Sequence, residues 1–145
     1  MTSLAAPAAA DELSDFEAAR RSYDRQSYSK AARGFESLVG GAVPRARNPV
    51  VRSEARKYLG ATYLFLGKEP EAREQFRRLL EEDPDYDIDP VAFPEAVVNT
   101  FQEVKADVDV QRARQEAVEK ARLEQERAGE IEELIAQQQR IAALE

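Results

Sequence analysis

The densest group of possible metal ligands lies between residues 81 and 89, where six acidic side chains occur: Glu81, Glu82, Asp83, Asp85, Asp87 and Asp89. Alternating carboxylates on a loop suit Ca²⁺, because this ion takes several oxygen ligands. An EF-hand loop starting at Asp83 would need Gly at its sixth position and Glu at its twelfth, where the sequence has Ile88 and Pro94. A start at Asp85 fails in the same way. We therefore expect a solvated acidic connector without a bound metal.

The residue types needed for catalysis are scarce in this chain. It contains no His and no Cys, which removes imidazole bases, thiol nucleophiles, disulfides and zinc-finger sites. The acidic pairs at residues 69/71 and 107/109 fall on predicted helix ends or exposed helix rather than in a predicted pocket. Gly40-Gly41 is not followed by the Gly-Lys-Ser/Thr of a phosphate-binding loop. We therefore expect no cofactor and a binding protein rather than an enzyme.

The composition indicates one domain with an appendage, and its charge is unevenly distributed. The chain has 145 residues, of which 43% are apolar, and no apolar run is long enough to span a bilayer. Residues 20–78 carry fourteen basic and six acidic side chains, a net of +8, whereas residues 79–145 carry a net of −11. Two interpretations remain open: solvated helix faces, or a basic receptor surface for an acidic peptide. Nucleic acid is disfavoured, because Gly-aromatic RNA motifs are missing and the acidic segment would repel phosphate.

The spacing of apolar residues predicts five helices and no strand. Each predicted helix has a start signal, which is either a side chain that can accept a hydrogen bond from the first backbone N–H groups or a proline, which lacks an N–H group. These signals are the capping box 14–17, Ser27, Asn48-Pro49, Pro70 and Pro94. Gly40, Gly67 and Asp83-Pro84 are the predicted ends of the second, third and fourth helices.

The fifth predicted helix changes character along its length. Its first part carries a seam typical of a buried face: Val97, Phe101, Val104 and Val108. Polar residues replace this seam between residues 111 and 129, and apolar ones partly restore it afterwards: Ile131, Leu134, Ile135, Ile141 and Leu144. The segment after Val108 is therefore expected to be either a solvated helix that frays or a short coiled coil.

The third and fourth predicted helices carry a spaced motif: Leu59, Gly60, Tyr63, Ala72, Phe76 and Pro84. This pattern resembles the tetratricopeptide repeat, in which L-G-x2-Y, A-x3-F and P recur over 34 residues. Arg56 stands where that family often has Trp. The first two helices match less well, since Ala19 replaces the Gly and the loop between residues 40 and 48 adds about seven residues.

The resemblance implies an all-α fold, with two helix hairpins stacked as a right-handed solenoid and a long C-terminal helix as cap. Small residues such as Gly60 and Ala72 stand where antiparallel helices would approach closely, and Tyr63 and Phe76 would fill the space between turns. Each hairpin leaves one apolar face that the next helix must cover.

The resemblance also implies a concave surface lined by the first helix of each hairpin. The candidate partner-binding residues there are Arg20, Tyr23, Lys57, Leu64 and Phe65. The family's clamp for chaperone C-termini also needs Asn, which these helices lack, so we do not expect a cochaperone. A mixed groove of this kind would hold an extended or helical peptide. The alternative is that Leu64 and Phe65 pack under the fifth helix.

Residues 83–101 further resemble bacterial cell-envelope repeat proteins, in which an Asp-Pro connector follows the last repeat and a charged helix leads onward. Ala8-Ala9-Ala10 is similar to the small-residue end of a secretory signal. These features favour a periplasmic or cell-envelope fragment of a longer protein, with a cytoplasmic location as the alternative.

We therefore predict three segments: a flexible tail over residues 1–12, tetratricopeptide-like repeats with their acidic connector over 13–93, and a long C-terminal helix over 94–145. The expected function is a non-catalytic protein–protein interaction scaffold that binds a partner segment on the repeat surface. The alternative is an oligomerisation or assembly module acting through the C-terminal helix. The expected partner is a protein with an acidic or mixed acidic-apolar segment, and a weak homo-oligomer through the C-terminal helix is also possible.

Overall fold

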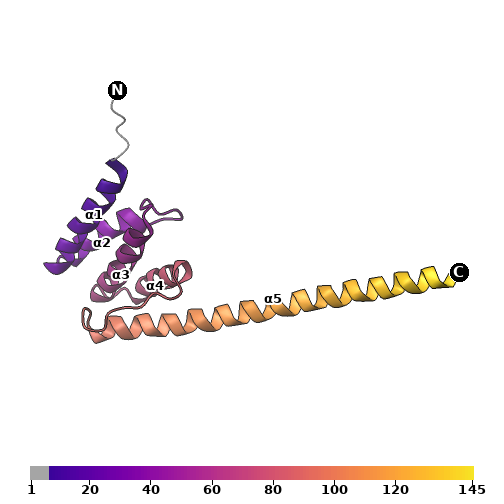
Figure 1. Ribbon diagram of the computed structural model, residues 1–145. Helices are drawn as coiled ribbons and strands as arrows, with labels where there is room; N and C mark the ends of the chain where they lie inside the picture. Colours follow the sequence, from indigo (N-terminus) through magenta and orange to yellow (C-terminus); the bar gives the residue numbers. More distant parts are fainter. Residues whose placement is uncertain (1–6) are drawn as a thin grey trace, which may run out of the picture. The chain divides into compact units, whose positions relative to one another are not determined.

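The computed structural model describes the backbone of residues 7–145 and the side chains of residues 11–145, and this part of the chain is helical, without a strand (Figure 1). The helices are α1 (Pro7–Asp24), α2 (Tyr28–Val39), α3 (Pro49–Phe65), α4 (Glu69–Glu82) and α5 (Glu95–Ala143). The predicted all-α class and long C-terminal helix are confirmed. The chain divides into two compact units, the first ending at Val108 and the second starting at Asp109. None of the described helices is long and apolar enough to cross a membrane.

The start of α1 corrects two predictions. The helix begins at Pro7, inside the predicted flexible tail and one full turn or more before the predicted capping box at Ser14. Residues 1–6 of that tail lie outside the described residues. Glu12 gives a tertiary reason for the early start, because it is 3% exposed and accepts hydrogen bonds from the backbone N–H groups of Arg47 (2.8 Å) and Asn48 (3.2 Å). A contact across 35 residues leaves no signal in the local sequence.

The predicted starts of α2, α3 and α4 agree with the structure to within a residue. Asn48 caps α3, since its Oδ1 accepts hydrogen bonds from the N–H groups of Val50 (2.9 Å) and Val51 (3.4 Å), and Pro49 follows as the first helical residue. Ser27 precedes α2 as predicted, but its side chain makes no capping hydrogen bond.

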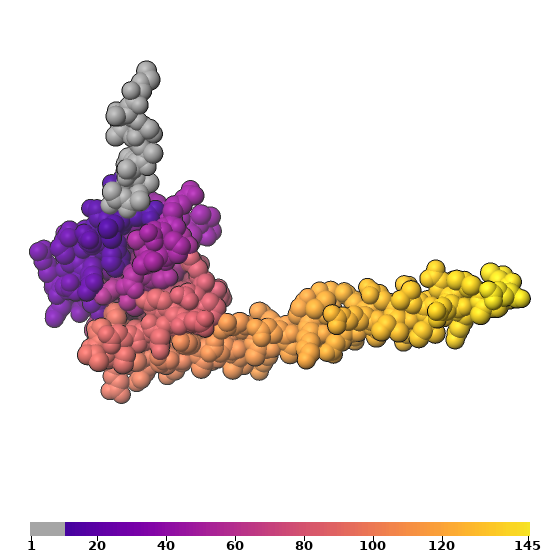
Figure 2. Space-filling view, in the orientation of Figure 1, coloured from indigo at the N-terminus to yellow at the C-terminus, as the bar shows by residue number. Residues whose placement is uncertain are grey.

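α1 packs against α2, α2 against α3 and α3 against α4, and the atoms of these helices form one packed body (Figure 2). At Gly60 a Cβ atom would lie 2.3 Å from Cε1 of Phe76, so the Phe76 ring rests directly on the α3 backbone. At Gly34 a Cβ atom would lie 2.7 Å from Cβ of Ala19, where α2 crosses α1. The two glycines therefore let the helices within each hairpin approach closely.

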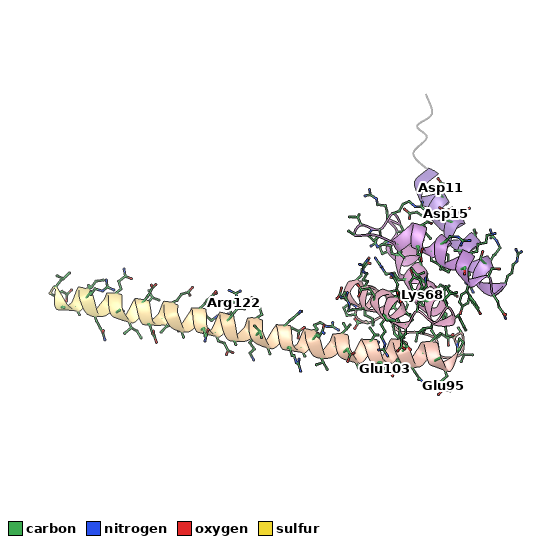
Figure 3. All side chains as sticks on the ribbon, turned by 180° about the vertical axis from the view of Figure 1, so that it is seen from behind. Asp11, Asp15, Lys68, Glu95, Glu103 and Arg122 are labelled. Atoms are coloured by element: carbon green, nitrogen blue, oxygen red, sulfur yellow. The ribbon has the colours of Figure 1, made fainter. Side chains whose placement is uncertain are left out.

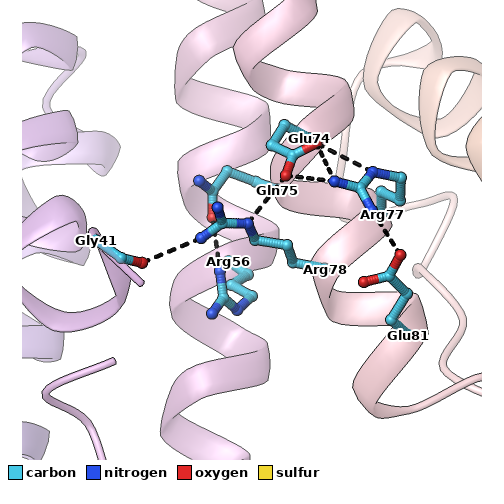
Figure 4. Close-up of polar contacts among 7 residues, drawn as sticks. All are labelled: Gly41, Arg56, Glu74, Gln75, Arg77, Arg78 and Glu81. Carbon is cyan, nitrogen blue, oxygen red and sulfur yellow. Dashed lines mark hydrogen bonds and ion pairs between the residues drawn. The ribbon is translucent and has the colours of Figure 1, made fainter. Parts of the chain in front are cut away.

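The loop from residue 40 to residue 48 is fixed to the helices around it by arginines. Arg78 of α4 donates a hydrogen bond to the carbonyl oxygen of Gly41 at 3.2 Å (Figure 4). Arg45 pairs with Asp15 of α1 at 2.7 Å, and Arg52 of α3 donates to the Arg47 carbonyl oxygen at 2.7 Å. The insertion is thus bonded to α1, α3 and α4 rather than standing free.

The acidic connector between α4 and α5 is more than a solvated segment. Ile88 and Phe93 are buried in the core, and the Tyr86 hydroxyl donates to Oε1 of Glu54 at 2.6 Å. The acids contribute to local structure, since Asp87 accepts hydrogen bonds from the Ile88 N–H and from Gln102, both at 2.9 Å. Among the described residues, no group of three or more potential ligands converges as a metal would require.

The second unit is the part of α5 from Asp109 onward. Its side chains point outward around the whole helix, as those near Arg122 show (Figure 3). Arg122 pairs with Glu119 and Glu126 along the helix, both at 2.5 Å, and such pairs support an exposed helix. Apolar side chains are nevertheless exposed here, among them Leu123, Ile131, Leu134, Ile135 and Ile141.

Candidate binding surface

Three aromatic side chains converge where α1 ends, α2 begins and α3 ends. Tyr28 and Phe65 are stacked, with ring centroids 4.5 Å apart and an interplanar angle of 9°. Tyr23 lies against both, at centroid distances of 5.9 Å from Tyr28 and 6.0 Å from Phe65. Phe65 is 42% exposed, and the two tyrosines are half-buried. We call Tyr23, Tyr28 and Phe65 the aromatic surface.

The arrangement follows from the local sequence. A turn with Gln26 at φ 63° joins α1 to α2, which places Tyr23, in the last turn of α1, beside Tyr28, the first residue of α2. Phe65 is the last residue of α3, which packs against both of these helices. Aromatic side chains at three adjacent helix ends therefore meet at one place.

Tyr58 lies beneath this surface and connects it to the core. Its ring is 5.2 Å from Tyr23 and 5.3 Å from Phe93, and it is almost completely buried. The guanidinium carbon of Arg20 lies 5.1 Å from the Tyr58 ring centroid, and Nζ of Lys57 lies 5.3 Å from it. Cations at this distance are attracted by the negative face of an aromatic ring.

The two cations differ in how their charge is balanced. Nζ of Lys57 lies 2.8 Å from Oε2 of Glu54, so its charge is compensated within α3. Arg20 is exposed and has no ion pair among the described residues. Arg20 is therefore the cation of this surface that is able to meet a carboxylate from outside.

The tyrosine hydroxyls of the aromatic surface are free to donate. Within residues 11–145, neither Tyr23 nor Tyr28 has a hydrogen-bond partner for its hydroxyl, in contrast to Tyr63, which donates to Glu36 at 2.6 Å. Burial raises the pKa of Tyr23 to about 12, so its hydroxyl stays protonated at physiological pH. Both hydroxyls are thus able to donate to a carbonyl or carboxylate oxygen.

The structure brings together four of the five predicted partner-binding residues: Arg20, Tyr23, Lys57 and Phe65. Leu64 is half-buried and packs against the core. Tyr28 and Tyr58 were not predicted as part of this surface, because both fit the buried stripe of their helices. Tyr28 is an aromatic residue near the helix ends where Tyr23 and Phe65 lie, and this is the signal that would have identified it.

No family model, curated protein or solved structure matches this chain. The aromatic surface offers an exposed ring, Phe65, stacked on Tyr28, and two hydroxyl donors; the guanidinium of Arg20, which lies over Tyr58, has no ion pair among the described residues. These groups suit the binding of an apolar side chain that has a carboxylate beside it.

Proposed function

We propose that this chain is a non-catalytic protein–protein interaction scaffold of the tetratricopeptide type, which holds a short segment of a partner on its aromatic surface. The observation that carries the proposal is the stack of Phe65 on Tyr28, with Phe65 42% exposed. Tyr and Arg are enriched among the residues that dominate binding energy at interfaces. An aromatic stack that is already formed also loses little conformational entropy on binding.

Helix packing supports the tetratricopeptide part of the proposal. Gly60 of α3 and Phe76 of α4 are in direct contact, as expected if the small and large positions of the repeat motif serve to pack one hairpin. Ala72 and Leu59, two further motif positions, are fully buried. Tyr63 and Pro84 complete the motif at the family's spacing.

The partner segment should combine an apolar or aromatic side chain with an acidic neighbour. The apolar group would lie on Phe65 and Tyr28, while the carboxylate would pair with Arg20. Lys57 contributes less than the sequence suggested, because Glu54 already compensates its charge. Binding should therefore weaken as the salt concentration rises, because salt screens the attraction between the carboxylate of the partner and Arg20.

The test is selection of 12-residue peptides from a random library on the full chain, followed by affinity measurement for the selected peptides. Phe65→Ala should weaken their binding by about tenfold, the equivalent of about 1.4 kcal/mol. Arg20→Glu should weaken acidic peptides more than neutral ones. Val50→Ala is the matched control, because Val50 is a 69% exposed apolar residue on the same helix. Peptides that bind the Phe65 and Val50 variants equally well would contradict the proposal.

A second candidate function, assembly through the C-terminal helix, is favoured by a separate observation. Ile131, Leu134, Ile135 and Ile141 are all at least half exposed on the second unit. Their spacing of three, one and six residues places them on one side of the helix. Burial of this side against another helix would give α5 a role in joining molecules.

A further inference from the structure

A groove of about 420 Å³ runs between α1 and α2, and none of the three residues of the aromatic surface lines it. Two rows of residues line it at helical spacing: Asp15, Ala18, Ala19 and Ser22 from α1, and Lys30, Arg33, Gly34 and Ser37 from α2. Most of these side chains are exposed or half-buried. The groove thus belongs to the surface of the first hairpin.

The shape of the groove suits a helix. Its floor is the close approach of Ala19 and Gly34, where no larger side chain would fit. Ala18, Ser22 and Ser37 are small, so they leave room above that floor. Grooves between two helices bind amphipathic helices through side chains at i, i+3, i+4 and i+7.

The groove carries uncompensated positive charge. Asp15 is paired with Arg45 at 2.7 Å, so the acid at its edge is already neutralised. Neither Lys30 nor Arg33 has an ion pair among the described residues. A helix that fits here should therefore carry acids beside its apolar side.

The chain itself contains such a helix segment. We call Ile131, Leu134, Ile135 and Ile141 the apolar stripe of α5. Glu130 and Glu132 lie 100° to either side of Ile131 on the helix, so they border the stripe on both edges. Neither glutamate belongs to an ion pair in the part of the chain that the structure describes. Lys30 and Arg33 both belong to α2, so the acid on the edge of the stripe that borders α2 would meet these two bases.

We infer that the apolar stripe of one copy docks in the α1–α2 groove of a second copy, a proposal that rests on the second candidate function. Pairing of two α5 helices in parallel register is disfavoured, because it would set Glu130 and Glu132 beside their own counterparts. Docking within one copy is disfavoured because α5 is one continuous helix from Glu95 to Ala143, and turning its end back would break helical hydrogen bonds.

The contact is small, so the association is weak. The stripe covers about 15 Å of helix and the α1 row about 10 Å, from a rise of about 1.5 Å per residue. The contact joins two different surfaces, and each copy carries both of them: one groove and one stripe. Such head-to-tail contacts give rings or open chains rather than a single fixed dimer contact.

Sedimentation of the full chain between about 10 μM and about 1 mM tests the proposal, since this range covers weak dissociation constants. The mean mass of the wild-type chain should rise with concentration at low salt and fall when salt is added. Lys30→Glu with Arg33→Glu should weaken association by about tenfold or more. Glu130→Lys with Glu132→Lys should do the same, and all four changes together should restore it.

Lys68→Glu with Arg114→Glu is the matched control, because it makes the same charge change at exposed positions that belong to neither the groove nor the stripe. Association that survives the groove reversal but is lost on Ile131→Ser with Ile135→Ser would show α5–α5 pairing and overturn the proposal. A monomer at all concentrations would also overturn it. Phe65→Ala should leave the mass unchanged, so this result is independent of peptide binding at the aromatic surface.

Discussion

At Gly60 the ring of Phe76 occupies the space that any other side chain would need. Both positions are buried, and Phe76 packs on Phe101 at a centroid distance of 5.4 Å, so the ring has little room to move. We predict that Gly60→Leu lowers the free energy of unfolding by roughly 2–4 kcal/mol through overpacking. Denaturant unfolding followed by circular dichroism measures this change.

Gly129→Ala is the control for that substitution. Apart from its chain neighbours and the backbone of its own helix, no atom lies within 4 Å of a Cβ built at Gly129. Alanine should therefore be neutral there or raise helicity, as expected from a propensity gain of about 1 kcal/mol. If Gly60→Leu were as well tolerated as Gly129→Ala, the close packing of α3 on α4 would be wrong.

Glu12 should make stability depend on pH. The backbone N–H groups of Arg47 and Asn48 hold the pKa of Glu12 below its ordinary value of 4.5. Its carboxylate therefore stabilises the fold above pH 4.5, and this contribution is lost as pH falls through the lowered pKa. We predict that Glu12→Gln lowers Tm by a few degrees at neutral pH and by progressively less in acid.

Glu17→Gln, an exposed change on the same helix, should leave Tm nearly constant at every pH. A Glu12→Gln deficit that persisted unchanged at pH about 2, where carboxylates are protonated in both states, would show that charge is not the cause.

Arg56 is a buried cation without a compensating acid in direct contact. It is 5% exposed, it donates to Gln75 at 3.1 Å, and its Nε has no partner among the described residues (Figure 4). Burial lowers the pKa of Arg56, with Arg78 adding to the effect. We predict that Arg56→Met raises the free energy of unfolding by about 1 kcal/mol, because an apolar side chain avoids the desolvation penalty. A clear loss of stability would show that Arg56 bonds to something further, such as water.

At the scale of helices, the sequence predicted those features that depend on interactions between residues close together in the chain. Asn48-Pro49 located the start of α3 because a cap acts within three residues. The start of α1 was missed because Glu12 is held by a loop 35 residues away. The aromatic surface was predicted in part: Tyr23 and Phe65 follow from the helix register, whereas the stacking of Tyr28 on Phe65 depends on how two hairpins meet.

The connector shows the same limit. Its acids dominate the sequence between residues 81 and 89, which suggested a solvated segment. Its apolar residues decide its path, because Ile88 and Phe93 are buried. Alternation of acidic and apolar residues allows one side of an extended segment to face the core. A count of the acidic residues alone does not reveal this alternation.

At the scale of the whole molecule, the two units should differ in what they contribute to stability. The core residues all lie at or before Val104, whereas the second unit buries none of its large apolar side chains. We predict that a chain of residues 1–110 folds cooperatively, with a Tm within a few degrees of the full chain. Calorimetry of both chains measures this difference.

A chain of residues 14–110 should be less stable than residues 1–110, because it lacks Glu12 and the first turns of α1. An unfolded 1–110 chain would contradict the independence of the first unit. Equal stability of the two truncated chains would contradict the role of Glu12.

The central claim, that the aromatic surface binds a partner segment, is tested most directly by ¹⁹F NMR of the fluorotyrosine-labelled chain. The chain has five tyrosines, whose resonances are assigned by single Tyr→Phe changes. On titration with a library-selected peptide, the resonances of Tyr23 and Tyr28 should shift, while that of Tyr63, bonded to Glu36 on another side of α3, should not. Phe65→Ala should suppress the shifts. Saturating binding that leaves Tyr23 and Tyr28 unshifted would contradict the account.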